Sequence, residues 1–241
     1  MNSTDMTFQA DLFKGKTVVV TGGTQGIGAG IAQQFAALGA SVIAAGLSPG
    51  DMQGIETIEL DVADARSTAA LFAKLDSLDV LVNCAGVIRR GDEHDIETFE
   101  RVIAVNLNGT MRMCSAARPL LASSKGSIVN TASMLTFFGG GLVPAYSASK
   151  GGVAQLTKSL AIAYAADGIR VNAVAPGWIA TPLTQALQDD GGRSQAILER
   201  TPMKRWGLPE DVARVTAFLA SPAASFMTGA IVPVDGGYLV A

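Results

Sequence analysis

Tyr146 and Lys150 are the two residues whose types and spacing best suit acid–base chemistry. They stand four apart at the start of a helical pattern, so they share one face of that helix. A phenol has an unperturbed pKa near ~10, and a nearby ammonium lowers that pKa by stabilising the phenolate. The alternative for such a pair is a packed ring beside a solvated amine. The spacing therefore predicts a proton-transferring tyrosine only if the sequence also offers other residues suited to the same site.

Ser133 supplies such a residue, because it follows the expected strand Ser127–Asn130. Ligands bind beyond the carboxyl ends of the strands in open α/β sheets. The Ser133 hydroxyl is therefore placed to hold a substrate oxygen beside Tyr146. Taken alone, such a serine is more often a loop or helix-capping residue.

A glycine-rich turn, Thr21–Gly28, directly follows the first expected strand and precedes an amphipathic helix. Glycines let the backbone turn tightly and let a pyrophosphate approach the free N–H groups at the helix N-terminus. The spacing is G-x-x-x-G-x-G, which differs from the commoner G-x-G-x-x-G of dinucleotide-binding turns. The turn predicts a dinucleotide site, and the alternative is a tight strand–helix connection without a ligand.

Short runs rich in Val and Ile alternate with helical patterns along the chain. The expected strands are Thr17–Thr21, Ser41–Ala45, Thr57–Leu60, Val80–Val82, Ser127–Asn130, Arg170–Val174 and Ile231–Val234. The expected helices are Gly26–Leu38, Ser67–Lys74, Ile96–Leu121, Ala148–Ala166 and Glu210–Ala220. This alternation predicts right-handed crossovers and an α/β fold with a doubly wound parallel sheet. Such a sheet brings the glycine turn and Ser133 to the same edge.

Composition narrows the class of protein. The 241 residues are 49% hydrophobic and 16% charged, with a formal net charge of -3, so no basic surface for nucleic acid is expected. A membrane-spanning helix needs about 20 consecutive apolar residues, and the longest apolar stretch is interrupted by Gly139, Gly140, Gly141 and Pro144. We expect no membrane partner and one catalytic domain over 13–241, after a disordered lead over 1–12.

The lead lacks a basic-then-apolar signal pattern, so a cytoplasmic location is expected. Cys84 and Cys114 lie in apolar contexts and are expected to be reduced thiols. His94, the one histidine, lies in the polar run Gly91–Asp95 and is expected to be solvated. No Cys/His cluster has metal-ligand spacing, so no metal site is predicted.

Together these motifs resemble the short-chain dehydrogenase/reductase superfamily, over a span from about Phe13 to Tyr238. The matching motifs are Thr21–Gly28, Asn83–Gly86, Asn106, Ser133, Tyr146 with Lys150, and Pro176–Gly177. The resemblance implies a single Rossmann-type domain with a seven-stranded parallel sheet. It also implies a homotetramer, with Pro233–Gly237 matching the family's C-terminal segment.

The resemblance assigns four catalytic residues. Tyr146 matches the acid/base that exchanges a proton with the substrate oxygen, and Lys150 the residue that lowers the tyrosine's pKa and contacts the nicotinamide ribose. Ser133 matches the residue that holds the substrate oxygen. Asn106 matches the residue that supports a proton-relay water near the lysine.

It also implies the cofactor contacts. Those around the phosphates and adenosine are Gly22, Thr24, Gln25, Gly26, Ile27, Gly28, Leu47, Asp61, Val62, Asn83, Ala85 and Gly86. Those around the nicotinamide are Tyr146, Lys150, Pro176, Gly177, Ile179 and Thr181. Cys84 departs from the family pattern, which most often has Asn or Ala there.

The choice between NAD and NADP depends on the end of the second strand. A carboxylate there selects the 2′-hydroxyl of NAD, and a nearby Arg selects the 2′-phosphate of NADP. Gly46 occupies the acidic position, while Leu47 and Gln25 stand where NADP users tend to carry basic residues. Because no cation is present to hold a phosphate dianion, we predict NAD. Ser48 keeps NADP possible.

The segment 181–206 is rich in charged and polar residues and corresponds to the family's substrate lid. Three stretches, Gly86–Arg90, Ala132–Phe137 and Arg205–Gly207, resemble those of the 2-deoxy-gluconate 3-dehydrogenase and gluconate dehydrogenase group. A guanidinium suits bidentate binding of a carboxylate. We therefore expect a substrate carboxylate to be held by an arginine, the candidates being Arg89, Arg90, Arg193 and Arg200.

The predicted function is an NAD(P)-dependent oxidoreductase that interconverts a secondary alcohol and a ketone, on a sugar acid or another polar hydroxy compound. One alternative is a 3-oxoacyl thioester reductase, which would use NADPH and present a basic docking face. Another is a cofactor-binding subunit without catalysis. Such subunits typically lose the Tyr or the Lys, and both are present here.

Overall fold

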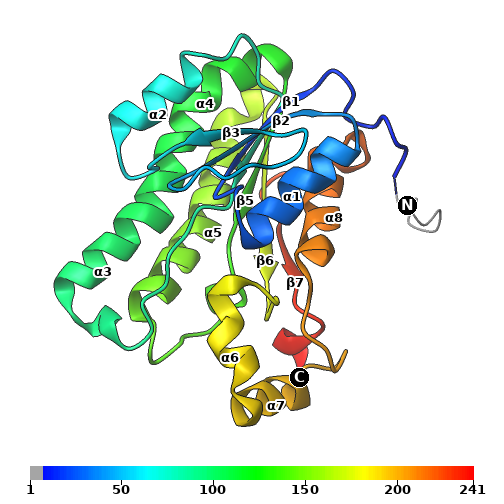
Figure 1. Cartoon of the computed structure of the whole chain (residues 1–241). Coiled ribbons are helices and arrows are strands. Elements are labelled where there is room, and N and C mark those ends of the chain that lie inside the picture. The colour runs from blue at the N-terminus through cyan, green and yellow to red at the C-terminus, as the bar shows by residue number, and fades with distance from the viewer. Residues whose placement is uncertain (1–7) are drawn as a thin grey trace.

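A computed structural model describes residues 8–241, and its centre is one parallel sheet of seven strands in the order β3-β2-β1-β4-β5-β6-β7 (Figure 1). The strands are β1 (Thr17–Thr21), β2 (Ser41–Gly46), β3 (Glu56–Glu59), β4 (Val80–Asn83), β5 (Ser127–Thr131), β6 (Arg170–Pro176) and β7 (Ile231–Val234). The predicted α/β fold and its seven-stranded parallel sheet are confirmed. The strand order changes direction at β1 and β4, so the glycine turn after β1 lies at the switch point where ligands bind.

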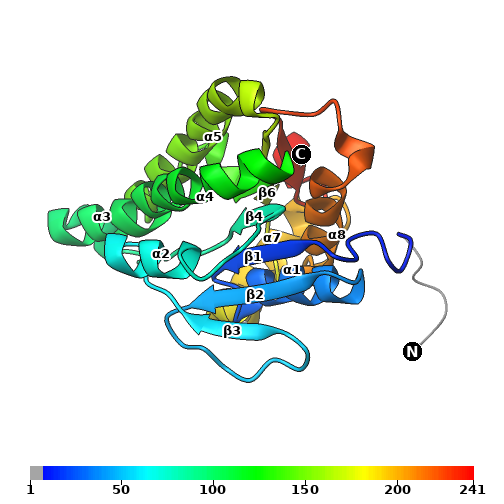
Figure 2. The ribbon, with the colours of Figure 1, turned by 90° about the horizontal axis from the view of Figure 1, so that it is seen from above.

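Helices cover both faces of the sheet, as the view from above shows (Figure 2). They are α1 (Gly26–Ala37), α2 (Ala65–Phe72), α3 (Ile96–Ile103), α4 (Thr110–Ser124), α5 (Pro144–Tyr164), α6 (Gln185–Asp189), α7 (Gly191–Arg200) and α8 (Pro209–Ala220). Phe35 of α1 and Ala217 of α8 pack with Val18 and Val20 on one face. Met113 of α4 packs with Val19 on the other. Because both faces of the sheet are buried, β1 contains three consecutive valines rather than alternating apolar and polar residues.

The expected helix Ile96–Leu121 is one helical run to Ser124, but its middle, Ala104–Gly109, is a π-helix. Such a segment holds an extra residue in the turn and changes which side chains face the neighbouring elements. Asn106 lies within it and is fully buried. The expected helix Ala148–Ala166 begins earlier, at Pro144, where proline at the first helical position needs no N–H partner.

The expected disordered lead over 1–12 is wrong for residues 8–12, which the structure describes. Its residues 1–7 lie outside the described part of the structure. Residues 8–12 include a turn in which the Leu12 N–H donates to the Gln9 carbonyl oxygen at 3.1 Å, and Phe8 and Leu12 pack against the core. Apolar side chains therefore hold this segment against the domain. Within 8–241 no helix is long and apolar enough to cross a membrane.

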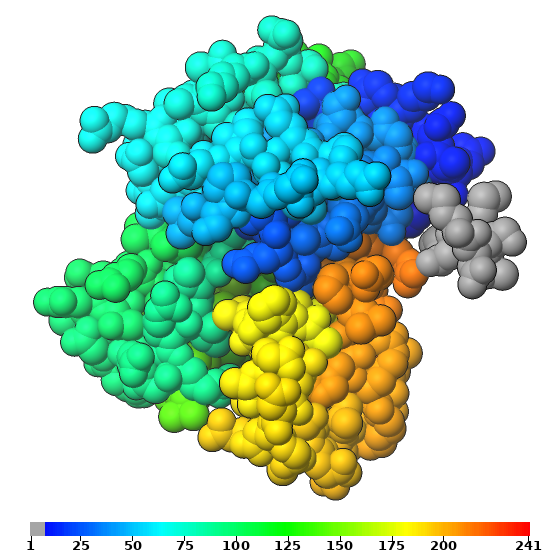
Figure 3. Space-filling view, viewed as in Figure 1, coloured from blue at the N-terminus to red at the C-terminus, as the bar shows by residue number. Residues whose placement is uncertain are grey.

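The expected lid segment, 181–206, contains α6 and α7, two helices that the sequence patterns did not predict. Figure 3 shows these helices (yellow to orange) beside a hollow that opens toward the green part of the chain. The segment's two ends lie together, because the Ala180 N–H donates to Gly207 O at 2.8 Å and the Gly207 N–H to Trp178 O at 2.9 Å. The segment therefore leaves and returns to the domain at one place.

Candidate active site

The turn after β1 is built so that only glycine fits at its closest contacts. A Cβ on Gly28 would lie 2.1 Å from the Gly22 carbonyl oxygen, and a Cβ on Gly22 would lie 2.8 Å from the Ala85 Cα. Gly22 also has a φ of +63°, which L side chains rarely adopt. Gln25 precedes α1 without capping it through its side chain, so N–H groups of the first turn stay available for an anion. This arrangement fits the pyrophosphate of a dinucleotide.

A cavity of about 370 Å³, here the glycine-turn cavity, joins this turn to the catalytic helix. Ten of the predicted cofactor contacts border it: Gly22, Gln25, Gly26, Ile27, Gly28, Ala85, Gly86, Tyr146, Lys150 and Thr181. Cys84, Thr131, Pro182 and Leu183 border it as well, and the sequence analysis assigned them no contact. Three further predicted contacts, Pro176, Gly177 and Ile179, border an adjoining cavity.

That second cavity, about 350 Å³ and here the Ser133 cavity, lies between the end of β5 and the segment 181–193. It shares Ile27, Thr131, Tyr146, Thr181 and Leu183 with the glycine-turn cavity. Tyr146 therefore lies where the glycine-turn cavity and the Ser133 cavity meet. A dinucleotide in the first space and a substrate in the second would both lie against it.

Five predicted cofactor residues border neither cavity: Thr24, Leu47, Asp61, Val62 and Asn83. The Asn83 amide is buried and donates to Asn130 Oδ1 at 2.9 Å, so its side chain holds β4 to β5. Asp61 Oδ1 accepts from the Ala63 N–H at 2.8 Å in a local turn. Leu47 is 67% exposed, beyond the end of β2. These residues lie outside the enclosed part of the site.

Burial dominates the electrostatics of Tyr146. It raises the pKa of the phenol to about 12, and electrostatic repulsion from an ionised Cys84 and from Glu93 acts in the same direction. A hydrogen bond with the Ser133 hydroxyl lowers that pKa but does not outweigh burial. Lys150 is not among the groups that shift the pKa of this phenol, so the lowering expected from the ammonium does not offset burial.

Lys150 is buried at 4% exposure, and this burial lowers the pKa of its ammonium to about 8. The Nζ donates to the Thr131 carbonyl oxygen at 2.6 Å and lies 5.5 Å from the centre of the Tyr146 ring. The spacing of four residues thus places the two side chains together, as predicted. Desolvation thus favours the neutral form of both groups: it raises the pKa of the Tyr146 phenol and lowers that of the Lys150 ammonium.

Ser133 caps a short turn and also borders a cavity, so its position fits both of the roles that the sequence left as alternatives. Its Oγ accepts from the Leu135 N–H at 3.2 Å, which caps the short 3₁₀ turn Met134–Thr136. The same hydroxyl lies at the Tyr146 phenol and borders the Ser133 cavity. A serine hydroxyl has one donor and two acceptor positions, so the cap leaves it able to bind a ligand oxygen.

Asn106 uses its side chain to fix the loop after β4. Its Oδ1 accepts from the Val87 N–H at 2.8 Å, and its Nδ2 donates to Val87 O at 2.9 Å and to Ser149 Oγ at 3.1 Å. A Cβ on Gly86 would lie 3.4 Å from Asn106 Oδ1 and 3.7 Å from Lys150 Nζ. The structure therefore brings Asn106, Gly86 and Lys150 together.

The four candidate arginines separate into two pairs. Arg90 and Arg193 border the Ser133 cavity, and Arg193 also pairs with Asp190 at 3.4 Å. Arg89 does not border it, and its guanidinium donates to Ile88 O. Arg200 does not either, because its guanidinium lies 4.2 Å from the Tyr238 ring centre. Arg89 and Arg200 are thus poor candidates for contact with substrate.

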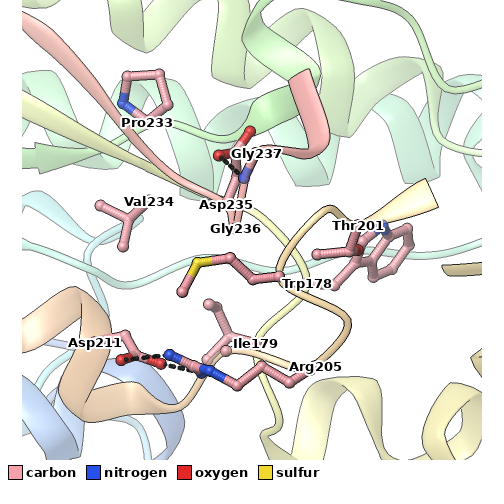
Figure 4. A pocket seen from close by; sticks show the side chains of 12 residues that line it. Trp178, Ile179, Thr201, Arg205, Asp211, Pro233, Val234, Asp235, Gly236 and Gly237 are labelled. Atoms are coloured by element: carbon pink, nitrogen blue, oxygen red, sulfur yellow. Dashed lines mark hydrogen bonds and ion pairs between the residues drawn. The ribbon is translucent and has the colours of Figure 1, made fainter. Parts of the chain in front are cut away.

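A third cavity, about 340 Å³, lies behind Trp178 and Ile179, which also border the Ser133 cavity (Figure 4). At its edge Arg205 forms two hydrogen bonds with Asp211, at 2.7 and 3.1 Å. This ion pair attaches the end of the 181–206 segment to α8. Within residues 8–241 no three His, Cys, Asp or Glu side chains form a group that could hold a metal ion.

Comparison with known proteins identifies the family. A family model described as enoyl-(acyl carrier protein) reductase matches residues 22–239. The 2-dehydro-3-deoxy-D-gluconate 5-dehydrogenase of Bacillus subtilis is 42% identical, covering 94% of this chain and 95% of that protein. The cis-4-hydroxycyclohexanecarboxylate dehydrogenase of Sinomonas cyclohexanicum is also 42% identical, covering 95% and 98%.

Among solved structures, a candidate 2-deoxy-D-gluconate 3-dehydrogenase from Agrobacterium tumefaciens with bound NADP is 40% identical. It has a TM-score of 0.89 and covers 97% of this chain and 100% of that one. The chain belongs to the short-chain dehydrogenase/reductase family. It is an NAD(P)-dependent oxidoreductase that acts on hydroxyl groups.

Proposed function

We propose that this enzyme interconverts a secondary alcohol and a ketone on a small hydroxy acid, with a sugar acid as the preferred substrate. One observation carries the proposal: Arg90 and Arg193, from two separate segments, border the same cavity as Ser133 and Tyr146. Guanidinium groups beside the reacting centre suit a substrate that carries a carboxylate. Two relatives support this choice, because each is named for a hydroxy acid or its oxidised form.

We assign the proton transfer to Tyr146 and the placing of the substrate oxygen to Ser133. When bound, the nicotinamide supplies the hydride acceptor for oxidation or the hydride donor for reduction. During oxidation the phenolate oxygen of Tyr146 takes the proton of the substrate hydroxyl. The Ser133 hydroxyl holds the oxygen of that substrate hydroxyl in place. During reduction the phenol returns the proton to the new alkoxide. Because burial raises the pKa of the phenol to about 12, the protein alone favours the protonated form that reduction needs.

For the cofactor, our prediction remains NAD over NADP. A Cβ on Gly46 would lie 2.9 Å from Thr24 Oγ1, so the acidic residue that selects NAD has little room here, and our prediction rests on the lack of a cation for a 2′-phosphate. No basic residue stands at Gln25 or Leu47 to balance a 2′-phosphate. The NADP bound to the Agrobacterium relative supports the alternative for that protein. Comparing kcat/KM for the two cofactors decides between them.

We further propose a homotetramer in the cytoplasm, built on a single domain that includes residues 8–12 and in which residues 181–206 form a lid. The family resemblance supports the assembly, and exposed apolar residues such as Ile162 and Phe226 are available for contacts between subunits. Light scattering at several protein concentrations tests the tetramer. A monomer at all concentrations would contradict it.

The substrate proposal is tested with paired substrates and matched variants. We would measure kcat/KM for a sugar acid and its neutral polyol in the wild type and in Arg90→Ala, Arg193→Ala and Arg89→Ala. Loss of a charge-assisted hydrogen bond at Arg90 or Arg193 should lower kcat/KM for the acid by about 10- to 100-fold and spare the polyol. Arg89→Ala is the control, because Arg89 lies outside the cavity.

Two results would overturn this assignment. One is an equal loss on the acid and the polyol in both cavity variants. The other is a kcat/KM for reduction of a 3-oxoacyl thioester with NADPH that exceeds the kcat/KM for every sugar acid tested.

A further inference from the structure

Glu93 is a carboxylate at 1% exposure in the loop between β4 and α3, and the chemistry above does not use it. Its Oε1 accepts a hydrogen bond from the Arg89 N–H at 2.8 Å, and its Oε2 accepts one from the Tyr146 N–H, also at 2.8 Å. Each oxygen therefore binds one backbone N–H group. A single buried side chain joins the loop that carries Arg90 to the helix that carries Tyr146.

Helix α5 needs this contact, because it has no cap of its own. The residue before the helix, Val143, has no side-chain oxygen, and Pro144 has no N–H. Tyr146 is the third residue of α5, where a helix N–H has no partner within the helix. A carboxylate also interacts favourably with the positive end of the helix dipole. Glu93, 53 residues earlier in the chain, supplies the missing cap.

Two further contacts hold the same loop against the segment that leads into α5. The Gly91 N–H donates to Leu142 O at 2.9 Å, and His94 Nε2 lies 2.9 Å from Gly141 O. Arg90 lies between Arg89 and Gly91 and borders the Ser133 cavity. The backbone on both sides of Arg90 is thus attached to the start of the catalytic helix.

We propose that Glu93 is a positioning residue that holds the Tyr146 phenol at a defined place relative to the Arg90 side of the substrate cavity. The inference rests on the proposed function, because it takes Tyr146 as the proton-transferring residue. Glu93 attaches the backbone next to Arg90, the residue that recognises the acid, to the backbone of Tyr146, the residue that moves the proton. Small displacements of a reacting group cost large factors in rate.

The charge of Glu93 provides a second way to detect its effect on Tyr146, through the titration of the phenol. Burial is the main cause that raises the pKa of the Tyr146 phenol, and the negative charge of Glu93 acts in the same direction. Lys150 is the cation next to the ring, at 5.5 Å from its centre. Asp92 and His94 flank Glu93 in the same turn but are exposed. Neutralising Glu93 should therefore move the phenol titration to lower pH, whereas Glu93→Asp, which keeps the charge, should leave it near that of the wild type.

The decisive variant is Glu93→Gln, which has nearly the same shape. A glutamine amide has one acceptor oxygen and a donor NH₂, so it cannot accept from both N–H groups. Asp92→Asn is the matched control, because it removes the same charge one residue away on an exposed side chain. Glu93→Asp keeps the charge but shortens the side chain by one methylene group, so it cannot reach both N–H groups in the same way.

The first measurement needs neither substrate nor cofactor. In protein labelled with ¹³C at the tyrosine ring carbon that bears the hydroxyl, the Tyr146 signal is the one that Tyr146→Phe removes from the three tyrosines. We expect it to begin titrating at a lower pH in Glu93→Gln than in the wild type and in Asp92→Asn. An unchanged titration in Glu93→Gln, or an equal shift in Asp92→Asn, would overturn the proposal.

The second measurement is steady-state kinetics on the preferred substrate. We expect kcat to fall by about 10- to 100-fold in Glu93→Gln, with a smaller change in KM, because the proton-transferring group is displaced. In Glu93→Asp we expect a lower kcat with a pH profile like that of the wild type. If Glu93→Gln does not fold by circular dichroism, Glu93→Asp decides, and full kcat in that variant overturns the proposal. Turnover in Tyr146→Phe would instead contradict the proposed function and leave the titration test intact.

Discussion

The Lys150 ammonium donates a 2.6 Å hydrogen bond to the carbonyl oxygen of Thr131, the last residue of β5. This bond attaches the catalytic helix to the strand end that leads into Ser133. It also removes the ammonium from water beside the Tyr146 ring, 5.5 Å away. The lysine therefore connects the two parts of the site, and its burial has measurable consequences for stability.

Stability should depend on pH through Lys150. Burial lowers the pKa of its ammonium from 10.5 to about 8, so below pH 8 both the folded and the unfolded states bind the proton and folding bears the full cost of burying it. Above pH 8 the folded state releases this proton first, and stability rises until about pH 10.5. Between pH 7 and 10 the free energy of unfolding of the wild type should rise by about 2 kcal/mol relative to Lys150→Met.

Urea unfolding at several pH values and one protein concentration measures this difference. Other titrating groups are the same in the two proteins, so their effects cancel. A wild-type-minus-variant difference that stays constant from pH 7 to 10 would contradict the burial of a titrating ammonium at this position.

Removal of the phenol oxygen should abolish proton transfer. Tyr146→Phe is expected to lower kcat by about 10²- to 10⁴-fold, because that range is typical for loss of a general acid or base. Cofactor affinity, measured by fluorescence titration, should be nearly unchanged. Tyr164→Phe is the control on the same helix, because Tyr164 packs in the core away from both cavities. Turnover by Tyr146→Phe near the wild-type rate would refute the role of the phenol.

A side chain at Gly28 should disrupt the cofactor turn. Its Cβ would lie 2.1 Å from the Gly22 carbonyl oxygen, so the turn and α1 must move apart in Gly28→Ala. We expect a loss of about 2 kcal/mol in the free energy of unfolding and weaker dinucleotide binding. Gly191→Ala is the control, because no atom lies within 4 Å of a Cβ there. Equal stability and binding in the two variants would show that the turn tolerates side chains.

A cation at the end of β2 should change cofactor selection. Leu47 is 67% exposed, so an arginine can replace it without disturbing the core. Leu47→Arg should raise the ratio of kcat/KM for NADP over NAD by about tenfold, because a guanidinium binds phosphate in a bidentate way. If the ratio does not change, the 2′-position of the ribose lies elsewhere in the site.

Much of the site followed from local patterns. The glycine turn, the Tyr146–Lys150 spacing and the strand before Ser133 are short-range features, and the structure places all three around two adjoining cavities. Asn106 could be located by motif, but its π-helical backbone could not, since Ile96–Leu121 reads as one regular helix. The helix α6 was missed because it is only five residues long, and α7 because it begins with two glycines, which disfavour a helix.

Other features depended on packing between segments remote in the chain. Four arginines were equal candidates by sequence, and only the fold separates Arg90 and Arg193 from Arg89 and Arg200. Asn83 matches a cofactor motif, yet its amide turns inward to Asn130. Glu93 stands in a polar run that predicts solvent exposure, but it is buried at the start of α5.

Local sequence patterns were enough to predict the α/β fold, the parallel sheet and the residue types available for chemistry. Alternating strands and helices and fixed residue spacings are encoded locally, so they can be read without coordinates. The tertiary structure decided the electrostatics. The spacing of Tyr146 and Lys150 predicts an ammonium that lowers the phenol's pKa, whereas burial raises the pKa of the phenol to about 12 and lowers that of the ammonium to about 8. Desolvation depends on which distant segments cover a side chain, and packing alone settles that.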